Sequence, residues 1–462
     1  MLLPILAHAD AVEINGIYYN LITKAKQAEV TSNPNYYSGS IEIPSTVDYE
    51  GISYNVTKIG GQAFCYCENV TSMSIPNGIT DIGERAFMSC SFESITIPNS
   101  VKTIGYEAFY HCRKLASITI GNGLEKFDRK VFEDCVSLNK VVVKDIAAWC
   151  GVEFNSNPLE YAKHLYSDEN TEITELVIPD GITFINAKAF YGCSNITTLS
   201  IPNSVEFIGP SAFGRLNITN VTIPNKVTYL SGFDNCKNIK SITIPQSVTI
   251  IGMDAFWGCS GITSIEIPNS VTTIERGALG ATNLTSVIIP NSVTSIGEEV
   301  FDGCQKLTNV TIGNAVQSIG YCAFGHCQEL SDVFCYAEYV PQTEINAFDY
   351  SLIEYATLHV PENLINSYKS TIPWSGFGKF ENLSTSGVTH ILTDAVLIQS
   401  NGRLLTIEGV NDGETIDAYS LNGTKIGSAI SRNGVAQIKT DLKFGNIGIV
   451  KVNNKCVKVI IR

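Results

Sequence analysis

The cysteines and histidines of this chain repeat at a fixed spacing. The 462 residues include 14 cysteines and six histidines. His111 and His326 each directly precede a cysteine. A thiolate beside an imidazole is the pairing of a cysteine nucleophile with its base, and sets of Cys and His also bind zinc. Nine cysteines follow a phenylalanine by three positions, or mark the same point of a repeat: Cys67, Cys90, Cys112, Cys135, Cys193, Cys236, Cys259, Cys304 and Cys327.

The spacing argues against catalysis and against zinc. Stacked repeats place equivalent residues about 4.8 Å apart in a row, and a row does not converge on one point as zinc ligands must. His111 and His326 are nine repeats apart, so on the order of 40 Å. His111 and its neighbour Cys112 are expected to face opposite ways. No catalytic residue and no metal site follow from these residues.

Two interpretations of the cysteine row stay open. Disulfides between adjacent repeats are within reach, and export would permit them. The row continues without pairing off, however, which favours small buried thiols that face the turn backbone. Cys65 and Cys322 fall outside the row, so we expect them to be exposed.

Motifs of other chemistries are missing from the sequence. It has no glycine-rich phosphate loop, no His-Glu-x-x-His and no EF-hand loop. Glu298 and Glu299 fit a solvated turn. We therefore expect no cofactor and a protein that is not an enzyme.

Charge and hydropathy exclude further classes. The formal net charge of −14 disfavours nucleic acid or an anionic membrane as partner. No apolar run reaches the roughly 18–20 residues that span a bilayer. Residues 1–9 contain an apolar run from Leu2 to Ala7, and Ala7-His8-Ala9 has the small-x-small form of a signal-peptidase site. We interpret them as the remnant of a signal peptide, so the protein is expected to be secreted or surface-associated; a disordered terminus is the alternative.

A repeat of 21 to 23 residues must position all these groups. Its clearest copy is IPNSVTSIGEEVFDGCQKLTNVT at 289–311, and close copies begin at Ile201, Ile244 and Ile267. Each unit predicts a strand that Pro ends, an Asn-Ser turn, a second short extended piece and a tight Ala-Phe-x-Gly-Cys turn. Such a short unit cannot bury its apolar face alone, so the period predicts a β-rich solenoid.

A row of phenylalanines should form the core of this solenoid. Stacked aromatic rings bury much apolar area, and offset pairs add roughly 0.5–1.5 kcal/mol each. Leu279 takes the place of the ring in one repeat. The row consists of Phe64, Phe87, Phe109, Phe132, Phe190, Phe213, Phe233, Phe256, Phe301 and Phe324.

The unit Ile-Pro-Asn-Ser-Val-Thr-x-Ile-Gly-x-x-Ala-Phe-x-Gly-Cys-x-x-Leu-Thr-Ser-Ile resembles the BspA-like leucine-rich repeat, found in surface proteins of Bacteroidetes and some mucosal protists. The resemblance covers roughly residues 41–380. It implies a leucine-rich repeat array with a concave parallel sheet and a role in adhesion. Since this fold recurs with many ligands, the resemblance does not identify the ligand.

The repeat pattern divides the chain into domains. We assign residues 10–42 to an N-terminal cap, 43–344 to repeats, 345–383 to a C-terminal cap and 384–462 to a small β-sandwich. The cap at 345–383 should end in a strand at ATLHVP, a short helix from Glu362 and a plug of Trp374, Phe377 and Phe380. In 384–462, Asn422-Gly423 and Asn453-Asn454 are hairpin signals. This region resembles the sorting domain of type IX secretion; an ordinary immunoglobulin-like appendage is the alternative.

One repeat is enlarged, at residues 144–177. Ile146 to Cys150 fit a helical turn, and a second segment begins at Asn157-Pro158. Insertions in an array often carry function, which makes Trp149, Phe154 and Tyr161 a candidate site. The alternative is that the three aromatic residues form a satellite core.

The solvent side of the predicted strands is the other candidate site. It should present a flat, weakly charged surface of hydroxyls and amides that docks an extended protein or a glycan through many modest hydrogen bonds. Thr and Ser as plain strand filler are the alternative. The positions are Ser72, Ser74, Ser94, Thr96, Ser117, Thr119, Thr198, Ser200, Asn220, Thr222, Ser241, Thr243, Ser264, Glu266, Asn309 and Thr311.

Two functions of different classes follow. The favoured one is an exported binding protein that adheres to host extracellular proteins, glycans or other bacterial cells through the concave sheet. The other is a structural spacer or surface-assembly component without a heterologous ligand. Self-association without a foreign ligand would distinguish the second from the first.

Overall fold

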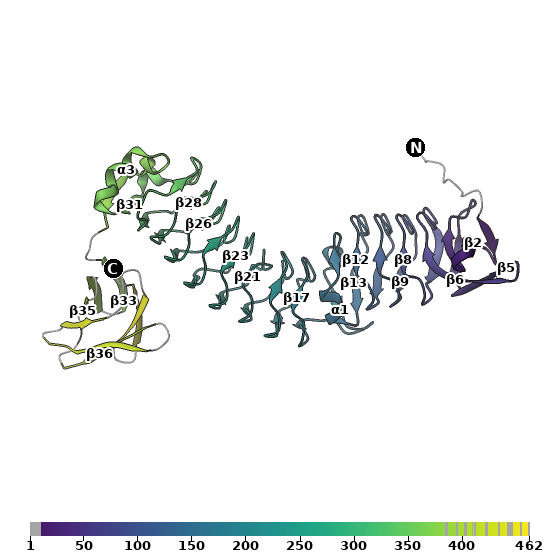
Figure 1. The fold of residues 1–462 in the computed structure, drawn as a ribbon, viewed down its shortest axis with the longest axis horizontal. Coiled ribbons are helices and arrows are strands. Elements are labelled where there is room, and N and C mark those ends of the chain that lie inside the picture. Colours follow the sequence, from purple (N-terminus) through teal and green to yellow (C-terminus); the bar gives the residue numbers. More distant parts are fainter. Residues whose placement is uncertain are drawn as a thin grey trace.

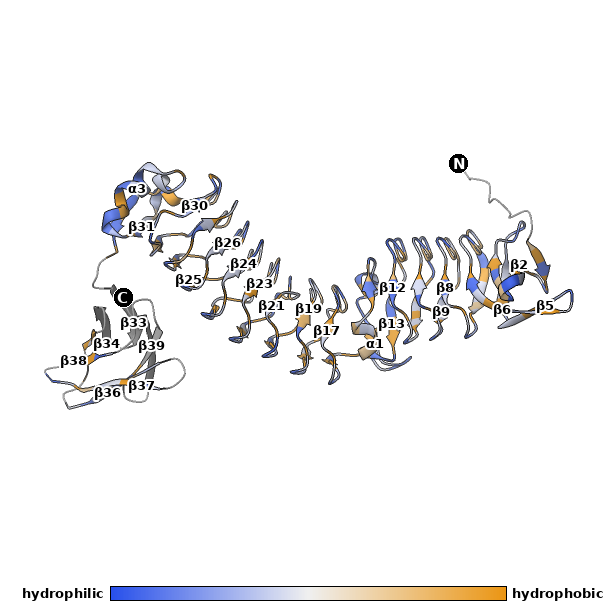
Figure 2. Cartoon of the chain, in the orientation of Figure 1, coloured by the Kyte–Doolittle hydropathy of each residue, from blue (hydrophilic) through white to orange (hydrophobic). Residues whose placement is uncertain are grey.

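The computed structural model describes residues 11–383 and, beyond them, residues 387–393, 396–401, 404–408, 410, 413–420, 424–432, 435–440, 447–452 and 455–460. The predicted signal remnant at residues 1–9 and both predicted hairpin turns lie outside the described residues. Figure 1 shows an elongated array of stacked coils that bends near α1 (Ile146–Cys150). Hydrophobic residues recur along the strands of successive coils (Figure 2). The predicted β-solenoid is confirmed.

Each regular coil contains two strands and a tight turn. The first strand carries the Ile-rich run before Pro, and its members are β4 (Ser38–Glu42), β7 (Asn69–Ser74), β9 (Ser94–Ile97), β11 (Ser117–Ile120), β13 (Lys140–Val143), β15 (Leu165–Tyr166), β16 (Glu175–Val177), β18 (Thr198–Ser200), β20 (Asn220–Thr222), β22 (Ser241–Thr243), β25 (Ser286–Ile289), β27 (Asn309–Ile312), β29 (Asp332–Cys335), β31 (Thr357–Val360) and β32 (Lys379–Asn382). The second strand follows the Asn-Ser turn, and its members are β6 (Ile52–Ile59), β8 (Asp81–Ile82), β10 (Thr103–Ile104), β12 (Lys126–Phe127), β14 (Glu153–Phe154), β17 (Phe184–Ile185), β19 (Phe207–Ile208), β21 (Tyr229–Leu230), β23 (Ile250–Ile251), β24 (Thr273–Ile274), β26 (Ser295–Ile296), β28 (Ser318–Ile319) and β30 (Gln342–Thr343).

Neighbouring coils pair in parallel and in register. Ile95 lies opposite Ile118, and Ile104 lies opposite Phe127, so the partners are one repeat apart. The Ala-Phe turn adds a third ladder, because the amide of Phe87 donates to the carbonyl of Ala108 in the next coil at 2.8 Å. Backbone groups on three sides of each coil are thereby satisfied by its neighbours.

The first strands do not form one continuous sheet over the described array. The described first strands form separate ladders: β4-β7, β9 to β15, β16-β18, β20-β22 and β25 to β32. Residues 262–268 form no strand, so Ser264 and Glu266 do not lie on one. One break falls at the enlarged coil, where the additional residues separate β15 from β16.

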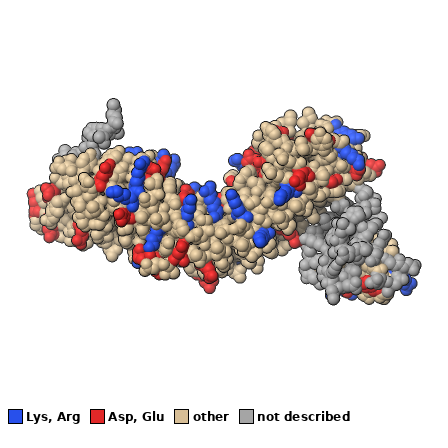
Figure 3. Space-filling model, turned by 180° about the vertical axis from the view of Figure 1, so that it is seen from behind, with Lys and Arg blue, Asp and Glu red and all other residues tan. Residues whose placement is uncertain are grey.

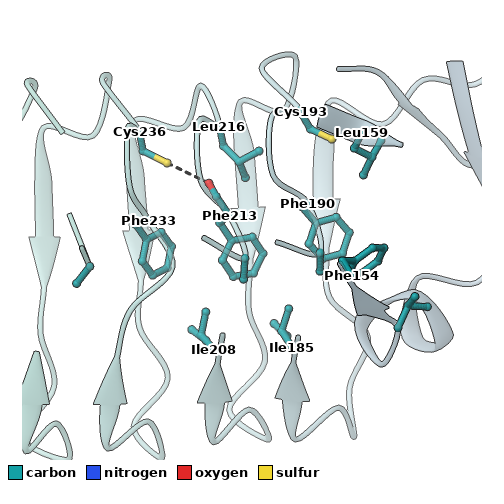
Figure 4. Close-up of a cluster of buried hydrophobic side chains, with 14 of the residues drawn as sticks. Phe154, Leu159, Ile185, Phe190, Cys193, Ile208, Phe213, Leu216, Phe233 and Cys236 are labelled. Carbon is teal, nitrogen blue, oxygen red and sulfur yellow. Dashed lines mark hydrogen bonds between the residues drawn. The ribbon is translucent and has the colours of Figure 1, made fainter. Parts of the chain in front are cut away.

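The phenylalanine row forms a stacked spine inside the array. Every ring named above is fully buried, as is Leu279. Ring centroids of consecutive coils lie 5.2 to 5.9 Å apart, for example 5.7 Å between Phe190 and Phe213 (Figure 4). Phe348 and Tyr37 extend the stack at its two ends, with centroids 5.4 and 4.7 Å from Phe324 and Phe64. The sequence pattern had not included these two rings.

The cysteine row lies beside the spine as free, buried thiols. All thirteen described cysteines are free. In Figure 4, the thiol of Cys236 donates to the carbonyl oxygen of Phe213 in the preceding coil, at 3.1 Å. No disulfide joins these described thiols. The expectation that Cys65 and Cys322 are exposed is wrong, because both are buried at the tight-turn edge.

In most coils the tight turn contains two left-handed residues, one before the Ala and one before the Cys. Lys130 and Asp134 have φ of 59° and 63°, and Gly258 has 72°. Gly is favoured at such φ because it has no Cβ. Another glycine has a different cause: a Cβ on Gly83 would lie 2.6 Å from the backbone nitrogen of Gly61. That position is set by the close stacking of two backbones.

Both ends of the array are covered. At the N-terminus, β1 (Val12–Ile14), β2 (Ile17–Ile22) and β3 (Gln27–Thr31) form antiparallel pairs, and β3 then pairs in parallel with β6. A 3₁₀ turn, η1 (Thr23–Ala25), joins β2 to β3, and β5 (Thr46–Tyr49) forms a hairpin with β6. These paired strands therefore cover the N-terminal end of the first coil.

At the C-terminus, β31 is followed by η3 (Glu362–Leu364), α3 (Ile365–Ser370) and η4 (Trp374–Gly376); η2 (Ile353–Tyr355) precedes it. Trp374 and Phe377 are buried and contact the Phe348 ring edge-on at 5.3 Å. Phe380 is only partly buried. These rings cover the apolar end of the spine.

The C-terminal region forms two antiparallel four-stranded sheets. One has the order β33-β34-β35-β38 and the other β37-β36-β39-β40. Leu405 and Ile438 from the first sheet share a core with Ile416 and Val450 from the second, as in a β-sandwich. The strands are β33 (Gly387–Thr393), β34 (Val396–Asn401), β35 (Leu404–Glu408), β36 (Thr415–Ser420), β37 (Lys425–Ile430), β38 (Val435–Lys439), β39 (Ile447–Val452) and β40 (Lys455–Ile460).

Candidate functional site

The enlarged coil is anchored to its neighbours by its aromatic residues. Asp145 caps α1 by accepting from the amide of Ala148 at 3.0 Å. The indole of Trp149 donates to the carbonyl of Ala189 at 2.7 Å, and its ring lies 4.8 Å from that of Phe154. A second short helix, α2 (Leu159–Ala162), follows.

Burial decides what the three candidate aromatic residues of this coil do. Trp149 and Phe154 are buried within the main core, and Tyr161 is partly buried against it. Trp149 and Phe154 therefore cannot present their rings to a ligand. Their burial favours the alternative, in which these aromatic residues belong to the core. They continue the apolar interior across the enlarged coil, where the regular spine is interrupted between Phe132 and Phe190.

A loop of the enlarged coil folds over the first-strand surface. Its Glu169 side chain accepts from the hydroxyl of Thr119 at 3.1 Å, and its Glu169 carbonyl accepts from Lys140. The ammonium of Lys140 also lies 4.9 Å from the ring centre of Tyr166. The loop thereby divides the surface into an N-terminal and a C-terminal part.

The same coil is fastened to the next by a polar cluster. The Nδ1 atom of His164 lies 2.6 Å from Oε1 of Glu172, and the amide of Asn195 donates to that carboxylate at 2.8 Å. The hydrogen bond with His164 lowers the pKa of Glu172. All three groups are occupied with one another, so the cluster holds the loop in place.

We call the solvent side of the first strands the hydroxyl face. Thirteen of its sixteen predicted residues are exposed, while Ser117 and Thr311 are half-buried. The prediction that Thr119 is exposed is wrong. Only 8% of this residue is exposed, because the 167–172 loop covers it. Val177 and Ile288 also point outward from the strands, with Val177 62% exposed, and the sequence pattern had passed over both.

The longest open part of the hydroxyl face runs from Thr198 to Thr311. Thr222 and Thr243 lie directly opposite each other on β20 and β22, and Asn220 lies opposite Ser241. The Ser241 hydroxyl donates to the amide oxygen of Asn220 at 3.2 Å. Such in-register rows present donors and acceptors at the strand spacing of about 4.8 Å.

A cleft lies where the enlarged coil breaks the stack. Its volume is about 770 Å³, within the range of ligand-sized sites. Asn77, Asn99 and Asn122 line one side, and Lys144 and Val177 line the other. Asn99 already accepts from the amide of Asn122 at 3.1 Å. No aromatic residue lines this cleft. No local sequence pattern points to this cleft, since it forms from turns of five different coils.

Charge does not concentrate on the array. On the side shown in Figure 3, Lys and Arg are interspersed with Asp and Glu among wide uncharged areas. Several charges pair between adjacent coils, as Arg85 does with Glu107 and Arg113 with Asp134 at 2.6 Å. These pairs neutralise charges along the tight-turn edge.

The two histidines of the repeat are not partners of the cysteines. His326 lies 2.8 Å from Asp302, and His111 pairs with Asp134. The thiols of Cys112 and Cys327 instead donate to the carbonyls of Phe87 and Phe301. Within the described part of the chain, no three His, Cys, Asp or Glu residues gather in a way that would hold a metal ion. Over the same residues, no helix has the length and hydropathy to cross a membrane.

The chain is similar to several solved structures. A leucine-rich cell surface protein of Faecalibacterium prausnitzii is 20% identical, with a TM-score of 0.44 over 82% of this chain and 96% of that one. A leucine-rich repeat protein of Bacteroides ovatus is 22% identical, with a TM-score of 0.40 over 72% and 99%. The pneumococcal vaccine antigen PcpA is 18% identical, with a TM-score of 0.47 over 81% and 98%. No curated protein matches the chain.

The repeat itself matches a family model. The model describes the BspA type leucine-rich repeat region, six copies long, and it matches residues 40–156, 163–279, 231–354 and 273–395. These segments together span more than half of the chain and include every regular coil described above. The protein belongs to the BspA-type leucine-rich repeat family.

Proposed function

We propose that this protein is an exported, non-enzymatic surface protein that adheres to extracellular proteins, glycans or other cells through the hydroxyl face. Membership in the BspA-type family supports a binding role at a cell surface. The observation that carries the proposal is the stretch of the hydroxyl face from Thr198 to Thr311, where the predicted polar side chains are exposed except for the half-buried Thr311 and where those of β20 and β22 lie in register. Since the core is filled by Ile, Phe and Cys, these are the polar groups that the array presents to solvent.

The binding mode follows from this geometry. Each hydroxyl or amide offers only a modest hydrogen bond, net about 0.5–1.5 kcal/mol. A ligand that extends along several coils adds many such bonds and gains from their repetition. An extended protein segment or a glycan chain has this form, whereas a small compact molecule does not. A partner from the host matrix or from another cell fits an exported chain.

The C-terminal β-sandwich is proposed to deliver or anchor the chain, as a sorting domain of type IX secretion would. Its two four-stranded antiparallel sheets support a separate small module. Deletion of residues 384–462 in a producing cell should leave the array unsecreted. Normal export of the truncated chain would contradict this role.

A panel of immobilised matrix proteins, mucins and glycans tests the adhesive function. The full chain should bind at least one of them, and the double variant T222R/T243R should bind it at least tenfold more weakly. The matched control is Q305R/Q328R, which adds two charges one coil apart on the exposed tight-turn edge. If no component binds and the purified chain instead self-associates, the structural-spacer function replaces the adhesive one.

A further inference from the structure

Four consecutive coils carry an apolar side chain where other coils carry a polar one. The position is the first residue of the second strand. We call Phe184, Phe207, Tyr229 and Ile250, on β17, β19, β21 and β23, the apolar strip. The corresponding residues of other two-residue second strands are Asp81, Thr103, Lys126, Glu153, Thr273, Ser295, Ser318 and Gln342. The apolar strip is therefore a local departure from the repeat.

The core does not require these side chains. Phe184 is 48% exposed and Phe207 42% exposed, although both are large rings. The next residue of each strand, such as Ile185 or Ile208, is fully buried and supplies the apolar contact inside. Exposed apolar rings that line up on a surface mark an interaction site. The strip thus has a role on the outside of the array.

The strip is narrow and is built from two pairs of parallel strands. Phe184 lies opposite Phe207, and Tyr229 lies opposite Ile250, in parallel pairs. Four strands at about 4.8 Å spacing give a row roughly 14 Å long and one side chain wide. The Tyr229 hydroxyl donates to Glu275 Oε2 at 2.7 Å and accepts from the amide of Met253 at 3.3 Å, which fixes its ring.

The border of the strip is polar, and the lysine beside it is paired. Exposed Thr183, Thr228 and Thr249 each precede a strip residue. Glu206 and Lys226 beside the strip neutralise each other in an ion pair at 3.1 Å. A ligand on the strip therefore meets apolar surfaces in the centre and hydroxyl groups at the margin, without an unpaired cation.

We propose that the apolar strip binds a linear, uncharged polysaccharide. A sugar ring has an apolar C–H face, which packs on aromatic and aliphatic side chains, and a rim of hydroxyls, which suits the threonine border. A chain of such rings has the width and length of the strip. A stable protein partner would need roughly 800 Å² and 20–30 residues per side, far more than four side chains supply. The site is separate from the hydroxyl face and does not depend on it.

Affinity electrophoresis of the full chain tests this site. The gels contain soluble β-glucan, xyloglucan, mannan or dextran as uncharged probes, and polygalacturonate as the charged probe. At least one uncharged polysaccharide should retard the protein. F184A/F207A should weaken that binding by about tenfold or more, since two ring contacts are lost. F184Y/F207Y, which keeps both rings, should bind as the wild type does.

Two control variants locate the effect. T273A/S295A changes the same position in the two coils that follow the strip and should leave retardation unchanged. T222R/T243R changes the hydroxyl face and should also leave retardation unchanged. The proposals for the two sites can therefore be contradicted independently of each other. Each variant should melt at the wild-type temperature, because the replaced side chains are outside the core.

Four results would overturn the proposal. The first is that no uncharged polysaccharide retards the protein. The second is that F184A/F207A is retarded as fully as the wild type. The third is that only polygalacturonate retards the protein. The fourth is a wild-type dimer in sedimentation that F184A/F207A dissociates, since this would make the strip a contact between copies of the chain.

Discussion

The thiol of Cys90 donates a hydrogen bond to the carbonyl oxygen of Phe64 in the preceding coil, with 3.1 Å between sulfur and oxygen. The same bond recurs from Cys112, Cys135, Cys236 and Cys259. In the coil that has Ser351 at this position, the serine hydroxyl donates to the Phe324 carbonyl at 2.6 Å. The position therefore selects a small side chain with a donor, and sulfur is not essential to it.

The first prediction concerns this donor. Replacement of Cys112 by Ala removes one of two hydrogen bonds to the buried carbonyl of Phe87, which also accepts from the backbone amide of Cys90, and should lower the free energy of unfolding by about 0.5–1.5 kcal/mol. Cys112→Ser keeps a donor, as Ser351 does, and should cost less than half as much. Urea denaturation of both variants measures the difference. Equal losses for Ala and Ser would show that only the volume of the side chain matters.

The second prediction concerns pH. Burial raises the pKa of the Cys67 thiol to about 11 and that of Cys135 to about 12, against about 9 in the unfolded chain. Above pH 9 the unfolded thiols lose protons that the folded ones keep. The stability contribution is complete below pH 9 and should be lost as pH rises towards 12, at up to about 1.4 kcal/mol per pH unit for each thiol.

Denaturation midpoints between pH 8 and pH 11 measure this loss. The control is a variant with serine at Cys112 and Cys135, which should show a shallower decline because two ionisable groups are gone. A decline as steep as that of the wild type would assign the effect to other groups. Thiol reagents should also leave the described cysteines unmodified until the chain unfolds.

The third prediction concerns the spine. Phe213 is stacked between Phe190 and Phe233, with centroids 5.7 and 5.5 Å away. Phe213→Ala should cost about 3–5 kcal/mol because it leaves a cavity. Phe213→Leu should cost less than about 1.5 kcal/mol, since Leu279 already occupies this position in another coil. Thermal melts distinguish the two, and a Leu variant as unstable as the Ala variant would contradict the equivalence of the coils.

The fourth prediction concerns close backbone stacking. A methyl group on Gly83 would lie 2.6 Å from the backbone nitrogen of Gly61, so Gly83→Ala should cost more than about 2 kcal/mol. Gly61→Ala is the matched control, because its Cβ would lie at 3.5 Å from the carbonyl of Glu84, an ordinary contact. Chemical denaturation of the two variants should separate them. Similar stabilities would mean that neighbouring coils can move apart without cost.

The sequence predicted the parts of the fold that repeat. All regular coils pack in the same way. Phe or Cys residues that recur at one position of the repeat therefore form a row in the structure. It did not reveal where the sheet breaks, because strand pairing at Ser264 depends on small backbone shifts between coils. The burial of Cys65 and Cys322 was also missed, since both lie at the tight-turn edge where the pattern does not alternate simply in and out.

The candidate sites were predicted less completely, for physical reasons. The hydroxyl face follows from period-two alternation, but Thr119 is covered by a loop about 50 residues away in sequence. The cleft is assembled from turns of several coils and has no local signature. The apolar strip did have a local signature. In four successive repeats, Phe, Phe, Tyr and Ile follow a Thr or Glu at the position where other repeats have a polar residue.

The central claim is that the array binds its partner through the hydroxyl face from Thr198 to Thr311. The most direct measurement is the dissociation constant of the full chain, T222R/T243R and Q305R/Q328R for a matrix or cell-surface component that retains the wild type. The account predicts at least tenfold weaker binding for T222R/T243R, wild-type binding for Q305R/Q328R and equal melting temperatures for all three. Unchanged binding by T222R/T243R would contradict it.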